Sequence, residues 1–118
     1  MAATDADKFP NGVRLRDLGL GDIEAGIALS REAGWNQGAE DWRWMIHHGR
    51  GWACIDSGER VVATALTLPQ SGSFGWISMV LVTAAWRRHG IASALMTHSI
   101  KALKAVGKTP GLDATPAG

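Results

Sequence analysis

The fold is decided by one stretch of the chain, Trp76-Ile77-Ser78-Met79-Val80-Leu81-Val82-Thr83-Ala84-Ala85-Trp86-Arg87-Arg88-His89-Gly90-Ile91-Ala92-Ser93. Its first seven residues form a short apolar run of strand length that contains several β-branched side chains. From Ile91 to Val106 the apolar residues recur at helical spacing, and the segment is too long for a strand. The sequence therefore predicts a strand that leads into a helix through a basic turn containing Gly90.

The predicted turn is suited to an anion. The first N–H groups of a helix have no intrahelical acceptor, and the helix dipole places partial positive charge at the same end. Gly90 and Ala92 carry little or no side chain, so a ligand can approach the backbone closely. Arg87, Arg88 and His89 add hydrogen-bond donors and positive charge. We expect a phosphate or pyrophosphate to fit this turn.

The turn also matches a known pattern. Arg87-x-x-Gly90-x-Ala92, directly after a strand that ends Val80-Leu81-Val82, resembles the pyrophosphate loop of the GNAT family of N-acetyltransferases, whose pattern is Gln/Arg-x-x-Gly-x-Gly/Ala. The resemblance covers nearly the whole chain from Val13 onward. It implies an α/β (α+β) fold with a mixed sheet of about five strands and three helices. It also implies acetyl-CoA as the cosubstrate.

The resemblance assigns roles to individual positions. The strand before the loop would offer main-chain groups to the pantetheine arm of acetyl-CoA at Val80, Leu81 and Val82. The loop and helix start would hold the pyrophosphate through residues Arg87, Arg88, His89, Gly90, Ile91, Ala92 and Ser93. Trp35 and Asn36 match the region of the family that faces the acceptor, and packing within the loop is an equally good interpretation for Trp35.

Length and composition indicate one globular domain. The chain has 118 residues, of which 46% are hydrophobic and 19% charged, and a chain of this size buries about two thirds of its unfolded surface. A formal net charge of +1 gives no general attraction for nucleic acid or an anionic membrane. No apolar run approaches membrane-spanning length, and residues 1–8 lack the apolar core of a secretion signal. We expect a cytoplasmic protein with no nucleic-acid or membrane partner.

The cysteine and histidine content bears on redox and metal chemistry. The single cysteine, Cys54, excludes an intrachain disulfide and is expected to be a buried structural thiol rather than a nucleophile. The adjacent pair His47 and His48 cannot share one helix face, and no second cysteine is available to complete a zinc set. We therefore predict no metal site.

Periodicity and helix breakers predict the remaining elements. Residues 1–12 are expected to be a flexible N-terminal tail, and residues 13–118 a partial GNAT domain. Trp42 lies at core spacing in the second predicted helix, and Trp44 points to another side. The predicted order is a strand at 13–17, helices at 23–33 and 39–48, strands at 52–55, 60–66 and 74–82, the long helix, and a final strand at 112–115.

The resemblance also implies that the domain is incomplete. Members of the family continue past the fifth strand with another helix and two strands, which form one wall of the acceptor pocket and often supply a tyrosine that protonates the departing thiolate. This chain contains no tyrosine. Without these elements a sheet edge should be exposed, so we expect a homodimer or a swapped oligomer that covers it.

No catalytic residue is assigned from the sequence. The strand at 74–82 contains no carboxylate, although some relatives carry a glutamate there. Glu40, Asp41 and Asp113 are alternatives for a base, and a cap, a solvated charge or a structural partner suits each of them better. The expected function is acetyl transfer from acetyl-CoA to an amine of a small molecule or peptide. The alternatives are a catalytically weak or inactive CoA-binding or dimerisation remnant, and a fragment of a longer enzyme.

Overall fold

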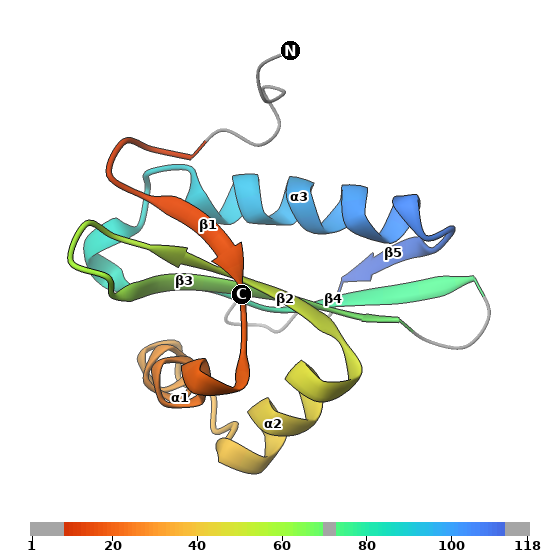
Figure 1. Ribbon diagram of the computed structural model, residues 1–118, viewed down its shortest axis with the longest axis horizontal. Helices are drawn as coiled ribbons and strands as arrows, with labels where there is room; N and C mark the ends of the chain where they lie inside the picture. The colour runs from red at the N-terminus through yellow and green to blue at the C-terminus, as the bar shows by residue number, and fades with distance from the viewer. Residues whose placement is uncertain (1–8, 70–72, 113–118) are drawn as a thin grey trace.

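The computed structural model describes residues 9–69 and 73–112. A five-stranded sheet runs through it in the order β1-β2-β3-β4-β5, with α3 on one face and α1 and α2 on the other (Figure 1). The elements are β1 (Arg14–Asp17), η2 (Leu20–Asp22), α1 (Ile23–Glu32), α2 (Ala39–His48), β2 (Arg50–Ile55), β3 (Val61–Pro69), β4 (Phe74–Val82), η3 (Ala84–Trp86), α3 (Ile91–Ala105) and β5 (Thr109–Leu112). The predicted α/β class, with five strands and three α-helices, is confirmed.

Each face of the sheet carries its own hydrophobic core, and the side chains of β2 contribute alternately to the two cores. Successive strand residues point to opposite faces. Ala53 and Ile55 accordingly belong to the cluster under α1 and α2, whereas Trp52 and Cys54 belong to the cluster under α3. All four side chains are buried, which explains why this strand reads as a continuous apolar run.

Trp42 fixes α2 against α1. Its side chain is 0% exposed, and its Nε1–H donates to Ser30 Oγ at 3.1 Å. A Cβ at Gly26 would lie 2.7 Å from the indole ring, so only glycine lets the two helices approach this closely. The prediction that Trp42 packs in the core is confirmed, and Trp44 lies on the exposed side of the same helix.

A bulge interrupts β4 at Met79 and Val80. Thr64 pairs with Leu81 and Leu66 with Ser78, so one residue of β3 faces two residues of β4. Met79 has a left-handed φ of 52°, and Thr64 Oγ1 donates to its carbonyl oxygen at 2.8 Å. A bulge re-aims the strand that contains it, and here it separates the half of β4 that also pairs with β5 from the half that leads to α3.

The final strand lies earlier than the sequence predicted. We expected the final strand at 112–115, but β5 spans Thr109–Leu112 and pairs in parallel with Phe74–Ile77; residues 113–115 lie outside the described part. Pro110 fits this edge strand, because the N–H that proline lacks is not needed there. Gly111 lies against the Trp76 ring, which an added Cβ would approach to 3.0 Å.

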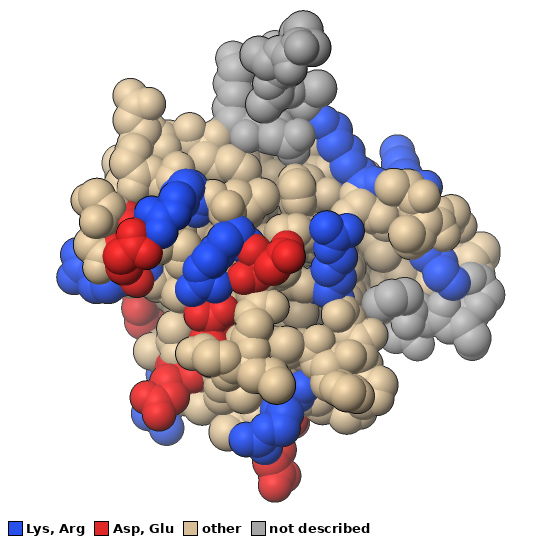
Figure 2. Space-filling model, viewed as in Figure 1, with Lys and Arg blue, Asp and Glu red and all other residues tan. Residues whose placement is uncertain are grey.

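The face that carries β1 has paired charges of both signs. Arg14 contacts Glu59 at 2.6 Å, and Arg16 contacts Asp22 at 2.8 Å. Figure 2 shows Lys and Arg side chains interspersed with Asp and Glu on this face, not a stripe of one sign. Within the described ranges, every helix is too short or too polar to cross a membrane.

Candidate functional site

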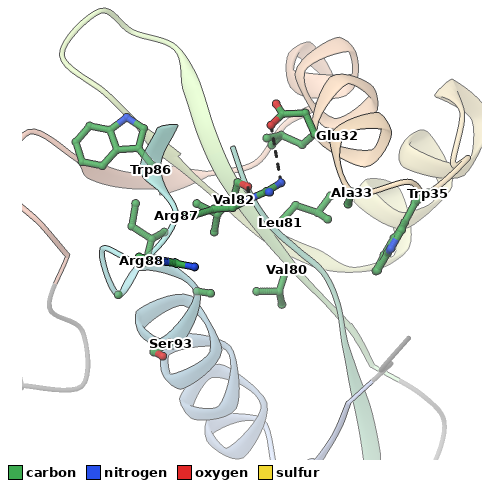
Figure 3. Close-up of a pocket in the computed structure, with 14 residues that line it drawn as sticks. Glu32, Ala33, Trp35, Val80, Leu81, Val82, Trp86, Arg87, Arg88 and Ser93 are labelled. Atoms are coloured by element: carbon green, nitrogen blue, oxygen red, sulfur yellow. Dashed lines mark hydrogen bonds and ion pairs between the residues drawn. The ribbon is translucent and has the colours of Figure 1, made fainter. Parts of the chain in front are cut away.

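A large cleft of about 600 Å³ opens where the end of α1, the end of β4 and the start of α3 meet (Figure 3). We call it the α3 cleft. Its lining residues come from three segments and are Leu29, Glu32, Ala33 and Trp35, then Val80, Leu81 and Val82, then Trp86, Arg87, Arg88, Gly90, Ile91, Ala92 and Ser93.

Helix α3 begins at this cleft. Gly90 is its N-cap with a φ of 82°, and the first bond of the helix runs from Ala94 N–H to the Gly90 carbonyl at 3.0 Å. The N–H groups of Ile91, Ala92 and Ser93 precede that bond and so have no acceptor within the helix. An added Cβ at Gly90 would meet no atom within 4 Å, so its space is open and only its left-handed backbone favours glycine. This corner therefore presents amides and partial positive charge to an anion.

Arg87 is partly neutralised by the protein itself. Its Nε–H donates to the Val82 carbonyl at 3.0 Å, and its guanidinium lies 4.0 Å from Glu32 Oε1. The Glu32 carboxylate also accepts hydrogen bonds from Thr83 Oγ1 at 2.8 Å and from Ala84 N–H at 3.0 Å. Glu32 thus ties the end of α1 to the segment after β4 and places a negative charge at the rim of the cleft.

Arg88 is the second cation of the loop and is held differently. Its backbone has a left-handed φ of 67°, and its side chain extends toward the cleft in Figure 3. It forms no ion pair with any residue in the described ranges. Its charge is therefore available to a ligand.

A second cavity of about 260 Å³ lies on the other side of the β4 bulge. It is lined by Gln37, Asp41, Trp44, Met45, Leu68, Ser78 and Met79. Met79 lines this cavity, and the next residue of β4, Val80, lines the α3 cleft.

The structure brings together most of the residues singled out from the sequence. The α3 cleft contains Val80, Leu81, Val82, Arg87, Arg88, Gly90, Ile91, Ala92 and Ser93, and also Trp35. His89 is exposed outside it, with its ring 5.3 Å from the Trp86 ring, and Asn36 lines neither space. Sequence reasoning missed Glu32 and Gln37, because nothing in their local pattern distinguishes them from ordinary polar residues near a helix end.

The other candidate groups are also placed. Cys54 is buried, and desolvation raises the pKa of its thiol to about 12, so it is protonated and inert at neutral pH. Glu40 is exposed and lines neither space, Asp41 lines the second cavity, and Asp113 lies outside the described residues. Among residues 9–69 and 73–112, no group of three or more His, Cys, Asp or Glu side chains could hold a metal ion.

Comparison with known sequences gives one family. The profile of the Acetyltransferase (GNAT) family matches residues 22–116, which include the α3 cleft and the second cavity. In the comparison with curated proteins, nothing matches this chain.

Solved structures share the fold at low sequence identity. A predicted acetyltransferase from Clostridium acetobutylicum, solved with acetyl-CoA, has a TM-score of 0.72 at 16% identity, over 90% of this chain and 83% of that one. Glucosamine-6-phosphate N-acetyltransferase from Arabidopsis thaliana has a TM-score of 0.72 at 15% identity, over 88% and 83% of the two chains. N-acetylglutamate synthase from Neisseria gonorrhoeae, complexed with coenzyme A and N-acetyl-glutamate, has a TM-score of 0.70 at 22% identity, over 81% and 23%.

Proposed function

The chain belongs to the acetyltransferase (GNAT) family, and we propose that it transfers an acetyl group from acetyl-CoA to an amine of a small molecule or peptide. The observation that carries this proposal is the α3 cleft, where free helix amides, Arg88 and the end of β4 meet in one space. The diphosphate of CoA would lie against the amides of Ile91, Ala92 and Ser93. The pantetheine arm would follow the main chain of Val80–Val82. The solved relatives named above include complexes with acetyl-CoA and with coenzyme A, which supports this choice of cosubstrate.

The proposed reaction is a direct transfer. The amine nitrogen attacks the thioester carbonyl carbon, the carbon–sulfur bond breaks, and CoA leaves as a thiolate. The proton lost by the amine reaches the thiolate through solvent, so the products are an acetamide and the free CoA thiol. Main-chain N–H groups near Val80 would stabilise the oxygen in the transition state. An acyl-enzyme on Cys54 is disfavoured because its thiol is buried and protonated.

Proton transfer is the weak step of this proposal. Among the described residues that line the α3 cleft, Glu32 is the one carboxylate, and it is already bound to Thr83 and Ala84. An alkylamine with a pKa of about 10.4 is neutral in only about one molecule in a few thousand at pH 7. A missing general base costs about 10²- to 10⁴-fold in rate. This arrangement favours slow turnover, and it keeps a CoA-binding protein without catalysis as the second candidate.

Calorimetric titration with acetyl-CoA tests the binding step. Ser93→Asp places a carboxylate at the first turn of α3, which stabilises the helix but repels the diphosphate. We expect acetyl-CoA to bind about 10- to 100-fold more weakly to this variant, as loss of about 1–3 kcal/mol requires. Ser93→Asn is the matched control, because it has nearly the same shape without charge and should bind almost as the native protein does. Equal affinity for all three proteins would contradict the placement of the diphosphate.

A free-thiol release assay with a mixture of amines separates the two candidates. Release of CoA thiol above the rate of spontaneous hydrolysis, and its loss with Ser93→Asp, would support an N-acetyltransferase. Tight binding of acetyl-CoA with no release for any amine would favour the CoA-binding protein.

Self-association is part of the proposal. β5 is an edge strand of the sheet, and the neighbouring strand β4 carries Phe74 and Trp76, which are 55% and 40% exposed. We propose that a second copy covers this edge as a homodimer or a swapped oligomer. Light scattering at tens of micromolar should report twice the chain mass, and a stable monomer would contradict this.

A further inference from the structure

We infer that the second cavity binds the acceptor, and that the acceptor is a compact amine carrying an additional positive charge, of the diamine class. The inference rests on the proposed function, because it names the substrate of the same reaction. It is drawn from three features of the cavity: an unpartnered oxygen, a carboxylate, and apolar walls that end in an exposed indole.

The unpartnered oxygen belongs to Gln37. Its Oε1 is buried, and it has no hydrogen-bond partner among the described residues. Buried polar atoms in native proteins nearly always have a partner, so an orphan at a cavity calls for a ligand. A carbonyl oxygen only accepts hydrogen bonds, and the ligand group that satisfies it must therefore be an N–H or O–H donor.

Asp41 supplies the charge that selects between these donors. Its Oδ2 accepts a hydrogen bond from Gly38 N–H at 3.0 Å, which fixes the side chain at the start of α2. A carboxylate has about four acceptor positions, so it can bind a ligand cation as well. The described lining residues of the cavity include no lysine, arginine or histidine. An acceptor with a carboxylate or phosphate would meet Asp41 without a counter-charge, whereas an ammonium group would form a charge-assisted hydrogen bond.

The remaining walls fit a short hydrocarbon chain. Met45 and Met79 are 8% and 3% exposed and form apolar surface with Leu68. Trp44 is 55% exposed and stacks on His48 with ring centroids 4.5 Å apart, so its indole is held in place at the cavity. An indole face attracts cations. A volume of about 260 Å³ is at the small end for ligand sites, which suits a molecule of few heavy atoms.

The position of the cavity relative to the α3 cleft completes the argument. Met79 lines the cavity and the next residue, Val80, lines the cleft. In this inference the reacting amine lies at the Met79 end of the cavity and faces the thioester. One amino group would remain an ammonium and contact Asp41 and Gln37. The other would enter neutral, form the new carbon–nitrogen bond, and lose its proton as the carbon–sulfur bond breaks. Asp41 is thus a specificity-determining residue that contacts the acceptor.

The test uses calorimetry to compare the acetylated forms of three acceptors of equal chain length, in which the reacting nitrogen is neutral. N-acetyl-1,4-diaminobutane, N-butylacetamide and 4-acetamidobutanoate are titrated into the full chain saturated with CoA. We expect the first, which alone keeps an ammonium group, to bind about tenfold more tightly than N-butylacetamide, since one charge-assisted hydrogen bond is worth about that factor, and 4-acetamidobutanoate to bind most weakly. Affinity for N-acetyl-1,4-diaminobutane no greater than that for N-butylacetamide, or tighter binding of 4-acetamidobutanoate, would overturn the inference.

Two variants assign the effect to one residue. Asp41→Asn keeps an oxygen for Gly38 N–H and should lose the tenfold diamine preference. Glu40→Gln, one residue away and outside the cavity, removes the same charge and should leave the diamine preference intact. If both variants behave alike, Asp41 has no specific role and the inference fails.

Failure of this inference can be told from failure of the proposed function. CoA is titrated alone first, and CoA binding without a diamine preference overturns only the acceptor class. If CoA does not bind, the proposed function fails, and titration of the three acetylated ligands into the CoA-free protein still decides whether the cavity selects a positive charge.

Discussion

The α3 cleft and the second cavity are both lined by residues of the β4 bulge, but the charged groups that line them differ in net sign. The cleft uses backbone amides and arginines from one continuous segment, residues 80–93, together with the end of α1. The cavity uses side chains from separate segments, with an acid where the cleft has bases. The charges of the described lining residues thus favour an anion in the cleft and, by our inference, a cation in the cavity. The three tests below break or sharpen this division, beginning with the largest effect.

Trp42→Ala should weaken ligand binding in both spaces, because it removes a core side chain that packs in the same cluster as a residue of each. Leu29 of the cleft and Met45 of the cavity lie in one buried cluster with Trp42. Truncating a fully buried tryptophan costs about 3–5 kcal/mol in the free energy of unfolding. We expect chemical denaturation to show that loss, and calorimetry to show that acetyl-CoA and diamine binding weaken together.

Trp44→Ala is the matched control for that test. Trp44 is exposed and lines the cavity but not the cleft. Its removal should therefore change the free energy of unfolding by about 0.5 kcal/mol or less. Diamine binding should weaken while acetyl-CoA binding stays the same. A loss of acetyl-CoA affinity with this variant would show that the two spaces are not separable.

Glu32→Gln should sharpen the division by removing the one carboxylate at the rim of the α3 cleft. The amide keeps an oxygen for Thr83 Oγ1 or Ala84 N–H, but it no longer offsets the charge of Arg87. Acetyl-CoA should bind about fivefold more tightly, which corresponds to about 1 kcal/mol for one charge near the surface.

Calorimetry at low salt measures this gain, and Glu24→Gln, at the other end of α1 and outside both spaces, is the control. Diamine affinity should not change. Weaker acetyl-CoA binding by the Glu32 variant alone would mean that the hydrogen bonds of the carboxylate matter more than its charge.

Acid pH should act on the whole domain and on neither space in particular. The hydrogen bond from Arg16 lowers the pKa of Asp22 from its ordinary value of 3.8, and the Gly19 N–H acts in the same direction, while burial opposes both. A carboxyl whose pKa is lower in the folded state contributes stability above its unfolded pKa and loses it as pH falls through the folded pKa. We expect about 0.5 kcal/mol to be lost between pH 5 and strongly acidic pH.

Urea unfolding at a series of pH values measures this loss, and Asp22→Asn should reduce the slope of the profile in that acid range. Asp56 and Glu59, whose pKa values are also lowered, should keep the rest of the slope. The variant should bind acetyl-CoA and the diamine as the native protein does at pH 7. An unchanged acid profile would show that Asp22 does not contribute to it.

The cleft could be predicted from the sequence because its parts are consecutive. A strand, a basic turn and a helix in that order place the Gly90 corner beside Val82 whatever the rest of the chain does. The cavity could not be predicted, because Gln37, Leu68 and Ser78 come together only when α2 lies on the sheet. The bulge was also hidden, since its left-handed residue is Met79 and not a glycine.

The helices show a similar limit at the level of single side chains. The bounds of α2 were predicted at 39–48 and are confirmed. Asp22 is the N-cap residue of α1, a position that aspartate favours, but its carboxylate accepts hydrogen bonds from Gly19 N–H and Arg16 instead of from the helix amides. N-cap propensity identifies the position of Asp22, but its hydrogen-bond partner depends on the tertiary structure, because Arg16 belongs to β1.

The extra residue in β4 lets the strand keep the same facing on both sides of an irregular point. Val82 lies opposite Ala63 and Ser78 opposite Leu66, so both halves of β4 follow the alternation of side chains that β3 sets. Deleting either Met79 or Val80 would leave those pairs in place, but it would remove a residue that lines the second cavity or the α3 cleft. A one-residue deletion here should therefore weaken ligand binding more than it disturbs the pairing of the sheet.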